Sequence, residues 1–573
     1  MASDQSEVRL NRASGWTDRV TYSYTSARLR NQMIINQPSG TAWTSTYAWD
    51  AGRRLQSVTS PAGTHSYVYS GAGGLTKRVT LPGSLSVTNE YDGLGRLWDT
   101  QFRNGTTILN RHGYAYNAGH QRTTLSRTNS NSAWNGYSTA TYDNAGEVRE
   151  VKAYNAGGVS VPAENFFYGY DAGWNLLKRT NNAAVTTYTP NVLNQAAGTY
   201  DQNGNRTAGA QNYTYDAEDQ LVSVEAPGAW RLEFVYDGRK RLRIIKDYES
   251  GGGSWLLKAE TRLIYDGLLV VQERSSAGHP RVTYTRGRDL SGSLESAGGI
   301  GGLLSRSDHA TSGTYQPTTH AFYHADGNGN VTYLSRTDGT TVGGYKYDPF
   351  GRTLSTTGTL ASGNLMRFSS KPWIQSISSS SGLYAYGYRF YDPVSQRWLN
   401  RDPIMESGGF NLYAFALNRS LELYDLWGLD AGGRVGPGFP NDGYVHPDPK
   451  FEPDLWSPND NCLSYALNRP GRGESHPGPP GGWDDCKSLI KQMKNQYRAS
   501  EPCKGKCDVG YHKIKVYTGF HFQREDGGGG WSEKELHYKA RTCKTGIFGG
   551  PLDRPQNPNN KPGKNCGELC VPN

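Results

Sequence analysis

The feature that most constrains this chain is the dipeptide Tyr-Asp, which recurs through the first 429 residues and is followed by a turn-forming stretch. Two examples are "YDGLGRLWDT" at 91–100 and "YDNAGEVREV" at 142–151. Asp, Asn and Gly supply the turn, and the alternating apolar and polar residues after it predict a strand with one buried face. Because a lone hairpin cannot bury such a face, we expect neighbouring units to stack into a continuous β-sheet.

The aspartates of this repeat are predicted to form turns rather than to catalyse a reaction. The copies are Asp92, Asp143, Asp171, Asp201, Asp216, Asp237, Asp266, Asp348 and Asp392, with Asp50 in the variant Trp-Asp. A content of 71 Gly and 38 Tyr with 20% charged residues also favours strands and turns. The glycines of "GGIGGLL" at 298–304 are not followed by Lys-Ser/Thr, so this segment is predicted to be a loop and not a phosphate cradle.

Bulk charge and hydrophobicity argue against several classes of protein. The net charge of +9 over 573 residues is mild and forms no long Lys/Arg run, so we do not expect a nucleic-acid partner. The start "MASDQSEVRLNR" has no apolar region, and no apolar run reaches about 18 residues, so neither Sec export nor a membrane span is expected. Another delivery route, or further sequence upstream, stays open.

The chain changes character at Trp427-Gly428-Leu429. Tyr-Asp does not recur after this tripeptide, and every one of the seven cysteines lies downstream, at 462, 486, 503, 507, 543, 566 and 570. The sequence therefore predicts that one structural unit ends, and another begins, close to residue 429.

The block before this boundary contains two carboxylates outside the simple repeat rhythm. They are Asp402 in "RDPI" and Asp425 in "YDLWGL", and a cation, Arg389, precedes them in "GYRFYDP". Two carboxylates held close together share one proton, so one can activate water while the other donates. A nearby Arg can orient a carboxylate or stabilise an oxyanion. The residues are thus those that peptide hydrolysis by a carboxylate pair needs, and the alternative is that both aspartates only cap turns.

The Tyr-Asp units, "YDPFGRTL" at 347–354 and the block at 383–429 resemble the RHS (YD-repeat) family with its associated core domain. This resemblance implies a β-strand spiral wound into a hollow shell that holds a C-terminal toxin. It also implies that the core block is an aspartyl protease that cuts the chain after its closing Gly-Leu.

Carried over residue by residue, the family pattern places the catalytic groups at Arg389, Asp402 and Asp425. The cleaved bond then joins Leu429 to Asp430. This chain departs from the pattern at Leu426, where the family has Pro.

The tail begins with a stretch rich in Gly and Pro, which is typical of an extended linker. In "SPNDNCLSYALNRP" the capping residues and apolar spacing predict a helix with Cys462 in or beside its first turn, a position that favours the thiolate. The segment 511–541 alternates apolar and polar residues around "DGGGG" and predicts a β-hairpin that carries His521. A Cys on an early helix and a His on a later strand are the components of papain-like catalysis.

Residues 455–573 resemble a small bacterial papain-like cysteine hydrolase. The resemblance implies Cys462 as nucleophile and His521 as general base, with Asp553 as the first choice for the third group. Glu533 stands where that family has a His. With one of seven cysteines as nucleophile, six remain for three disulfides in any of 15 pairings. The Cys-x3-Cys spacings do not match paired zinc knuckles, so no metal or other cofactor is expected.

Together these arguments predict a mainly β protein with a small disulfide-rich α+β domain at its C-terminus. The expected domains are the shell at 1–382, the core at 383–429, the linker at 430–454 and the toxin at 455–573. We expect a self-processing effector of interbacterial competition, made in the cytoplasm and delivered without a Sec signal, whose tail acts on protein or peptide in a periplasm or outside the cell. The expected partners are an immunity protein and a secretion apparatus or upstream carrier.

Two alternatives remain open at this stage. One is a non-enzymatic surface or adhesion protein whose Cys-rich tail is only structural. The other keeps the toxin but makes the tail a nuclease.

Overall fold

The computed structural model describes residues 19–38, 41–196 and 198–429 in full, and the backbone of several short strands elsewhere. It divides into two compact units, Met1–Asn441 and Asp442–Asn573. No helix among the described residues has the length and apolar character needed to cross a membrane.

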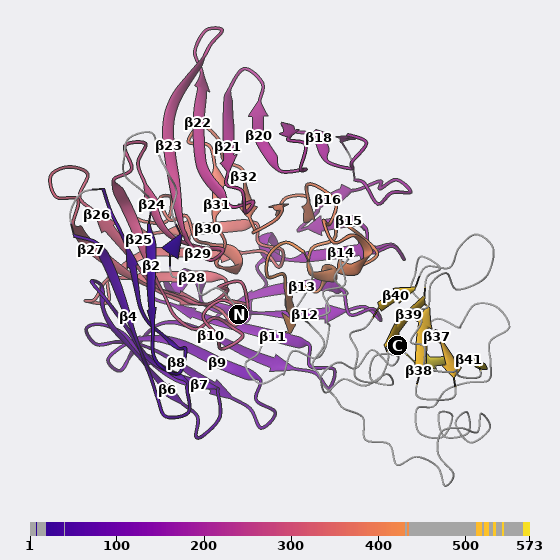
Figure 1. Ribbon diagram of the computed structural model, residues 1–573, viewed down its shortest axis with the longest axis horizontal. Helices are drawn as coiled ribbons and strands as arrows, with labels where there is room; N and C mark the ends of the chain where they lie inside the picture. The colour runs from indigo at the N-terminus through magenta and orange to yellow at the C-terminus, as the bar shows by residue number, and fades with distance from the viewer. Residues whose placement is uncertain are drawn as a thin grey trace, which may run out of the picture. The chain divides into compact units, whose positions relative to one another are not determined.

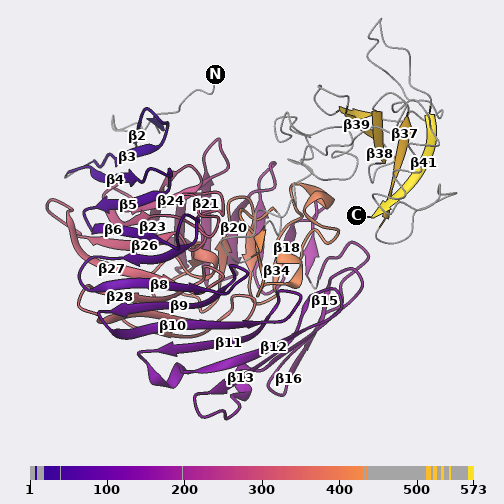
Figure 2. The same cartoon turned by 90° about the horizontal axis from the view of Figure 1, so that it is seen from below.

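The first sheet of the N-terminal unit has 16 strands that follow one another in chain order, each antiparallel to the last (Figure 1). Figure 2 shows β5 to β11 lying successively along this sheet. Its strands are β1 (Glu7–Val8), β2 (Val20–Tyr24), β3 (Arg30–Ile35), β4 (Trp43–Trp49), β5 (Leu55–Ser60), β6 (Gly63–Tyr69), β7 (Thr76–Thr80), β8 (Leu85–Tyr91), β9 (Leu97–Asn104), β10 (Thr107–Tyr116), β11 (Arg122–Asn129), β12 (Gly136–Tyr142), β13 (Val148–Asn155), β14 (Phe166–Tyr170), β15 (Leu176–Asn181) and β16 (Ala184–Thr187). Two short 3₁₀ turns interrupt it, η1 (Ser132–Trp134) and η2 (Pro162–Glu164).

The second sheet has 14 strands in the same sequential antiparallel order. They are β17 (Thr199–Tyr200), β18 (Arg206–Ala208), β19 (Asn212–Tyr215), β20 (Leu221–Ala226), β21 (Trp230–Tyr236), β22 (Leu242–Ser250), β23 (Trp255–Asp266), β24 (Leu269–Arg274), β25 (Pro280–Arg286), β26 (Leu303–His309), β27 (Pro317–Ala325), β28 (Val331–Ser335), β29 (Thr341–Tyr347) and β30 (Thr353–Thr357). The prediction of a mainly β chain built from stacked hairpins is therefore confirmed.

The repeat works through local hydrogen bonds, as the sequence predicts. In the copy at Tyr91-Asp92, Asp92 Oδ1 accepts from the backbone N–H groups of Leu94 and Arg96, each at 2.9 Å. Asp92 Oδ2 accepts from Arg96 Nε at 2.7 Å. The Tyr91 hydroxyl donates to the carbonyl of Thr76 in the preceding strand, at 3.0 Å. Each unit thus closes its own turn and ties itself to the unit before it.

The same turn forms at most other copies, whose aspartates accept from backbone N–H groups two and four residues on. Asp266 is an exception. Its carboxylate pairs with Arg30 of the first sheet through two contacts, at 2.5 and 3.0 Å. This pair joins parts of the chain that are 236 residues apart.

The second sheet is a middle layer, because successive residues of several strands are buried on opposite faces. Five of them pack against the first sheet: Ile264, Val271, Leu304, Phe322 and Tyr333. Their neighbours face a second cluster that includes the core block: Leu263, Tyr265, Val270, Leu303, Ala321 and Tyr323 pack with Ile374, Leu383, Phe390 and Leu399. Burial on both faces explains why these strands are more apolar than a half-exposed hairpin.

The core block forms a small four-stranded antiparallel sheet with irregular connections. Its strands are β31 (Trp373–Gln375), β32 (Gly382–Ala385), β33 (Phe390–Asp392) and β34 (Arg397–Trp398), and β35 (Leu423–Tyr424) pairs with β36 (Gly433–Arg434). Short 3₁₀ turns are η3 (Phe368–Ser370), η4 (Met405–Gly408) and η5 (Ala416–Asn418). The small sheet begins at β31, upstream of residue 383. The predicted loop at 298–304 is confirmed at 298–302, which precede β26, whereas Leu303 and Leu304 are already the first two residues of that strand.

The described part of the C-terminal unit is a five-stranded sheet in the order β40-β39-β38-β37-β41. The strands are β37 (Tyr511–Tyr517), β38 (His521–Glu525), β39 (Trp531–Lys534), β40 (Arg541–Cys543) and β41 (Asn565–Pro572). β38 and β39 pair across "DGGGG", where the hairpin was predicted. The predicted helix at Cys462 and the predicted disulfides lie outside what can be described, so the α+β character stays a prediction.

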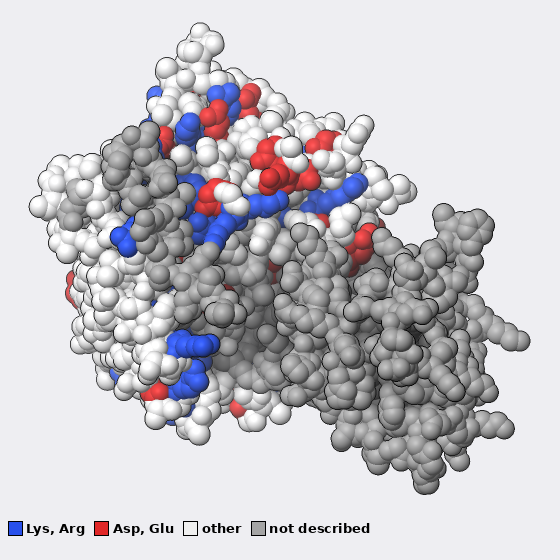
Figure 3. All heavy atoms as spheres, in the orientation of Figure 1, with Lys and Arg blue, Asp and Glu red and all other residues white. Residues whose placement is uncertain are grey.

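Charge on the N-terminal unit is mixed on the face drawn in Figure 3. Lys and Arg side chains lie among Asp and Glu in short groups, and no single-sign field spans the described part of this face.

Candidate active site

Three side chains predicted to be catalytic come together in the core block. Arg389 directly precedes β33, Asp402 lies between β34 and η4, and Asp425 directly follows β35. Arg389 Nη2 lies 2.6 Å from Asp402 Oδ2 and 3.7 Å from Asp425 Oδ2. All three side chains are at most 5% exposed. One buried guanidinium therefore bridges two carboxylates, and the catalytic role of the three residues stays a prediction.

Each aspartate also caps a turn with one of its two carboxylate oxygens, as the turn-capping alternative predicts. Asp402 Oδ1 accepts from the backbone N–H of Ile404 at 3.0 Å. Asp425 Oδ1 accepts from the N–H groups of Trp427, Gly428 and Leu429, at 3.1, 2.6 and 3.1 Å. In both residues the other oxygen, Oδ2, faces Arg389.

Asp425 is a variant of the repeat turn. In repeat copies such as Asp92, Oδ2 is bound by an Arg four residues later. Leu429 occupies that position after Asp425, and the guanidinium comes instead from Arg389 on another segment. A turn-forming carboxylate has thereby gained a long-range partner.

The residues just before the predicted cleavage point contact Arg389 and lie close to Asp402. Arg389 Nε donates to the carbonyl oxygen of Gly428. A Cβ atom built on Gly408 would lie 2.3 Å from the Leu429 carbonyl oxygen and 2.6 Å from Asp402 Oδ2. The carbonyl oxygen of Leu429 and the carboxylate of Asp402 thus both lie close to Gly408. Asp430 itself is outside the described residues.

Gly428 is required by its backbone. Its φ is 80°, and a Cβ there would lie 3.1 Å from Tyr386 Cβ and 3.2 Å from the backbone nitrogen of Arg389. Glycine therefore allows the chain to turn close against Arg389 immediately before Leu429.

Lys371 is a functional candidate that the sequence analysis did not identify. Its Nζ donates to the carbonyls of Leu426 and Gly298, at 2.6 and 2.9 Å. Burial lowers the pKa of Lys371 to about 7, Asp425 opposes this effect, Arg286 lowers the pKa further and Asp289 raises it. No local sequence pattern identifies this lysine, because the residues that it binds are 55 and 73 positions away along the chain.

Side chains of both large sheets hold the segment that leads to Asp425. Asn328 Nδ2 donates to the carbonyl of Ser420 at 2.6 Å, and Arg122 Nη1 donates to that of Leu421 at 3.3 Å. Asn418 Nδ2 donates to Glu147 Oε1 at 2.8 Å. Burial raises the pKa of Glu147 to about 7.

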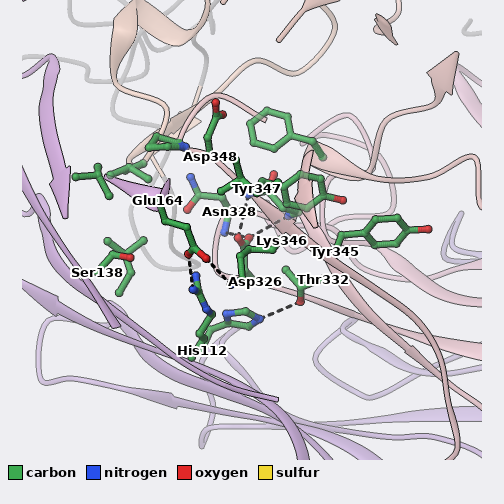
Figure 4. A pocket seen from close by; sticks show the side chains of 18 of the residues that line it. His112, Ser138, Glu164, Asp326, Asn328, Thr332, Tyr345, Lys346, Tyr347 and Asp348 are labelled. Atoms are coloured by element: carbon green, nitrogen blue, oxygen red, sulfur yellow. Dashed lines mark hydrogen bonds and ion pairs between the residues drawn. The ribbon is translucent and has the colours of Figure 1, made fainter. Parts of the chain in front are cut away.

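A cavity of about 130 Å³ lies between the two large sheets beside this segment (Figure 4). Glu164 in its wall accepts from Lys346 at 2.6 Å and from Arg127 at 2.7 Å. His112 contacts Thr332 at 2.9 Å, and burial lowers its pKa to about 4. These charged and polar groups bind one another across the two sheets. We therefore interpret the cavity as a polar contact between the sheets and not as a reaction centre.

The predicted residues of the tail are mostly outside the described part of the chain. Cys462 and Asp553 are not described. His521 is the first residue of β38 and pairs in register with Tyr517, so it starts a strand that is flanked by β37 and β39. Among the described residues no group of His, Cys, Asp and Glu is arranged to hold a metal ion.

No family model matches the chain. The double-stranded DNA deaminase toxin A of Burkholderia cenocepacia is 26% identical over 337 residues, which are 53% of this chain and 23% of that protein. The tRNA3(Ser)-specific nuclease WapA of Bacillus spizizenii is 28% identical over 234 residues, which are 39% of this chain and 9% of that protein. The chain thus spans less than a quarter of either relative.

Among solved structures, the Tc holotoxin pore of Photorhabdus luminescens matches with a TM-score of 0.57 at 20% identity. The match covers 72% of this chain and 21% of that one. It shows that most of this chain shares the fold of one part of that toxin chain.

Proposed function

We propose that this chain is part of a self-processing toxin, in which Asp402 and Asp425 cut the bond between Leu429 and Asp430 and so free a C-terminal toxic domain. The observation that carries the proposal is the position of Arg389, which contacts both carboxylates and the Gly428 carbonyl beside that bond. The fold shared with a Tc toxin and the toxin name of one relative, the DNA deaminase, support the same interpretation.

The proposed reaction is hydrolysis by one ionised and one protonated carboxylate. The ionised group takes a proton from water as its oxygen bonds to the Leu429 carbonyl carbon, and the Asp430 nitrogen leaves with a proton from the other group. Arg389 holds the two carboxylates together and balances their charge. Asp402 Oδ2 and the Leu429 carbonyl both lie beside Gly408, so we assign Asp402 as the protonated group. Asp425, whose Oδ1 accepts from three backbone N–H groups, is then the ionised group and also orients the end of the chain.

Intact-mass analysis of the purified chain tests this step. The wild type is expected to yield a fragment beginning at Asp430, and the Asp402→Asn and Asp425→Asn proteins are expected to stay whole. Asp392→Asn is the matched control, because this aspartate caps a neighbouring turn by accepting from Val394 N at 2.9 Å and its ion pair is with Arg206. A wild-type chain that stays intact over prolonged incubation at several pH values would sink the proposal, and so would loss of cleavage in the control alone.

We further propose that the freed domain stays with the β unit until delivery, and that the cell which makes it carries an immunity protein. Both fragments should co-elute in native size-exclusion chromatography after cleavage. Immediate separation would mean that the β unit of this chain does not form a closed chamber around the freed domain.

Two chemistries are open for the tail. A cysteine hydrolase would use Cys462, His521 and Asp553 on protein or peptide in an oxidising compartment. A tail acting on nucleic acid is favoured by the names of the two relatives, a DNA deaminase and a tRNA nuclease. Incubating the freed tail with tRNA, double-stranded DNA and a casein substrate decides between them, since each proposal predicts that a different substrate changes.

A further inference from the structure

Lys371 is buried next to the turn that carries Asp425 of the proposed cleavage site. It follows η3 and is 5% exposed. Its Nζ is bonded to the carbonyls of Leu426 and Gly298, and it lies 4.9 Å from the centre of the Trp427 ring and 5.2 Å from that of Tyr386. Two carbonyl oxygens and two aromatic faces all favour a cation at this point.

The residue that Lys371 binds is adjacent to Asp425. Leu426 stands between Asp425 and the three residues whose N–H groups bind Asp425 Oδ1. Holding the Leu426 carbonyl therefore fixes the turn that presents both the Asp425 carboxylate and the Leu429 carbonyl. Gly298 anchors the other side, and a Cβ on this glycine would lie 2.3 Å from the Leu426 oxygen.

We propose that Lys371 is a positioning residue for the cleavage after Leu429, acting through the Leu426 carbonyl and through its charge beside Asp425. This inference rests on the proposed function and adds a control of the same site by pH. Lys371 does not touch the bond that is cleaved, so it is not assigned a catalytic role.

The charge environment gives the direction of the pH effect. The groups that face Lys371 are Asp425, Asp289, Arg286 and the Tyr386 ring. Because burial lowers its pKa to about 7, the ammonium is lost as the pH rises through that value. Loss of the cation removes the charge opposite Asp425 and weakens the bond to Leu426, so cleavage is expected to slow over the same range.

The test compares cleavage rates of the full chain between about pH 5.5 and pH 8.5 in the wild type, Lys371→Met and Lys346→Met. The wild-type rate is expected to fall as pH rises through about 7. Lys371→Met should cleave about tenfold or more slowly below pH 7, the scale of a hydrogen bond to a charged group, and should lack that fall. Lys346→Met removes another buried lysine, whose Nζ donates to Glu164 in the cavity wall, and should keep the wild-type rate and profile.

The outcomes separate the two proposals. A wild type that is never cleaved overturns the proposed function and this inference with it. Wild-type cleavage that Lys371→Met reproduces in rate and pH profile overturns the inference alone. If Lys371→Met does not fold, the wild-type profile decides by itself, because a rate that does not change through pH 7 excludes control by this lysine.

Discussion

Replacing Gly408 by Ala should impair cleavage by displacing the Leu429 carbonyl and the Asp402 carboxylate from their observed positions. The φ angle of Gly408 is outside the left-handed region, so an alanine can adopt the same backbone, and only the new methyl group matters. That carbon would lie 2.3 Å from the Leu429 carbonyl oxygen, whereas ordinary contact begins at 3.4 Å. The carbonyl must therefore move by about 1 Å, and Asp402 Oδ2, which would lie 2.6 Å from the same methyl carbon, must shift as well.

A displacement of about 1 Å at a reacting carbonyl can cost about 100-fold in rate, or about 2.7 kcal/mol in activation free energy. The assay is a pulse of labelled cell-free synthesis followed by a chase, with the cleaved fraction read from denaturing gels at each time. Gly363→Ala is the control, because a Cβ there would meet no atom within 4 Å. If Gly408→Ala were processed as fast as Gly363→Ala, the Leu429 carbonyl could not be reacting in the observed position.

Three further results are expected. Arg30→Met should lower the free energy of unfolding by about 3 kcal/mol, because it leaves the Asp266 carboxylate buried between the sheets without its guanidinium; denaturant titration measures this, and a change below about 1 kcal/mol would contradict it. The folded state raises the pKa of Glu147 to about 7, so its contribution to stability is complete below its ordinary pKa of 4.5 and is lost as the pH rises through about 7. Thermal unfolding of Glu147→Gln should therefore vary less across that range than the wild type, and equal slopes would refute the assignment. In the isolated tail, prepared under oxidising conditions, Cys462 should be the one thiol that iodoacetamide labels, and toxicity should vanish in both Cys462→Ala and His521→Ala; a disulfide at Cys462, or full toxicity of the alanine variant, would exclude the cysteine hydrolase.

Most of the fold was accessible from the sequence because the repeat is local. In a unit such as Tyr91-Asp92 the bonds that set the turn join residues two and four apart, and the strand that follows shows its buried face as alternation. Such contacts depend on residue type and spacing alone. The exception, Asp266, has the same local sequence pattern, but its carboxylate binds Arg30. A pattern of neighbouring residues cannot predict this contact, because the two residues are 236 positions apart.

The candidate site shows the same division. The sequence, together with a family resemblance, identified the two carboxylates and the arginine of the candidate site. It also indicated a turn at Asp425. The tertiary structure alone decided three further features. These groups meet, Gly408 lies against the Leu429 carbonyl, and Lys371 binds the Leu426 carbonyl. Each depends on the packing of the small core sheet against the middle layer, which brings Gly298, Lys371 and Leu426 together although they are far apart along the chain.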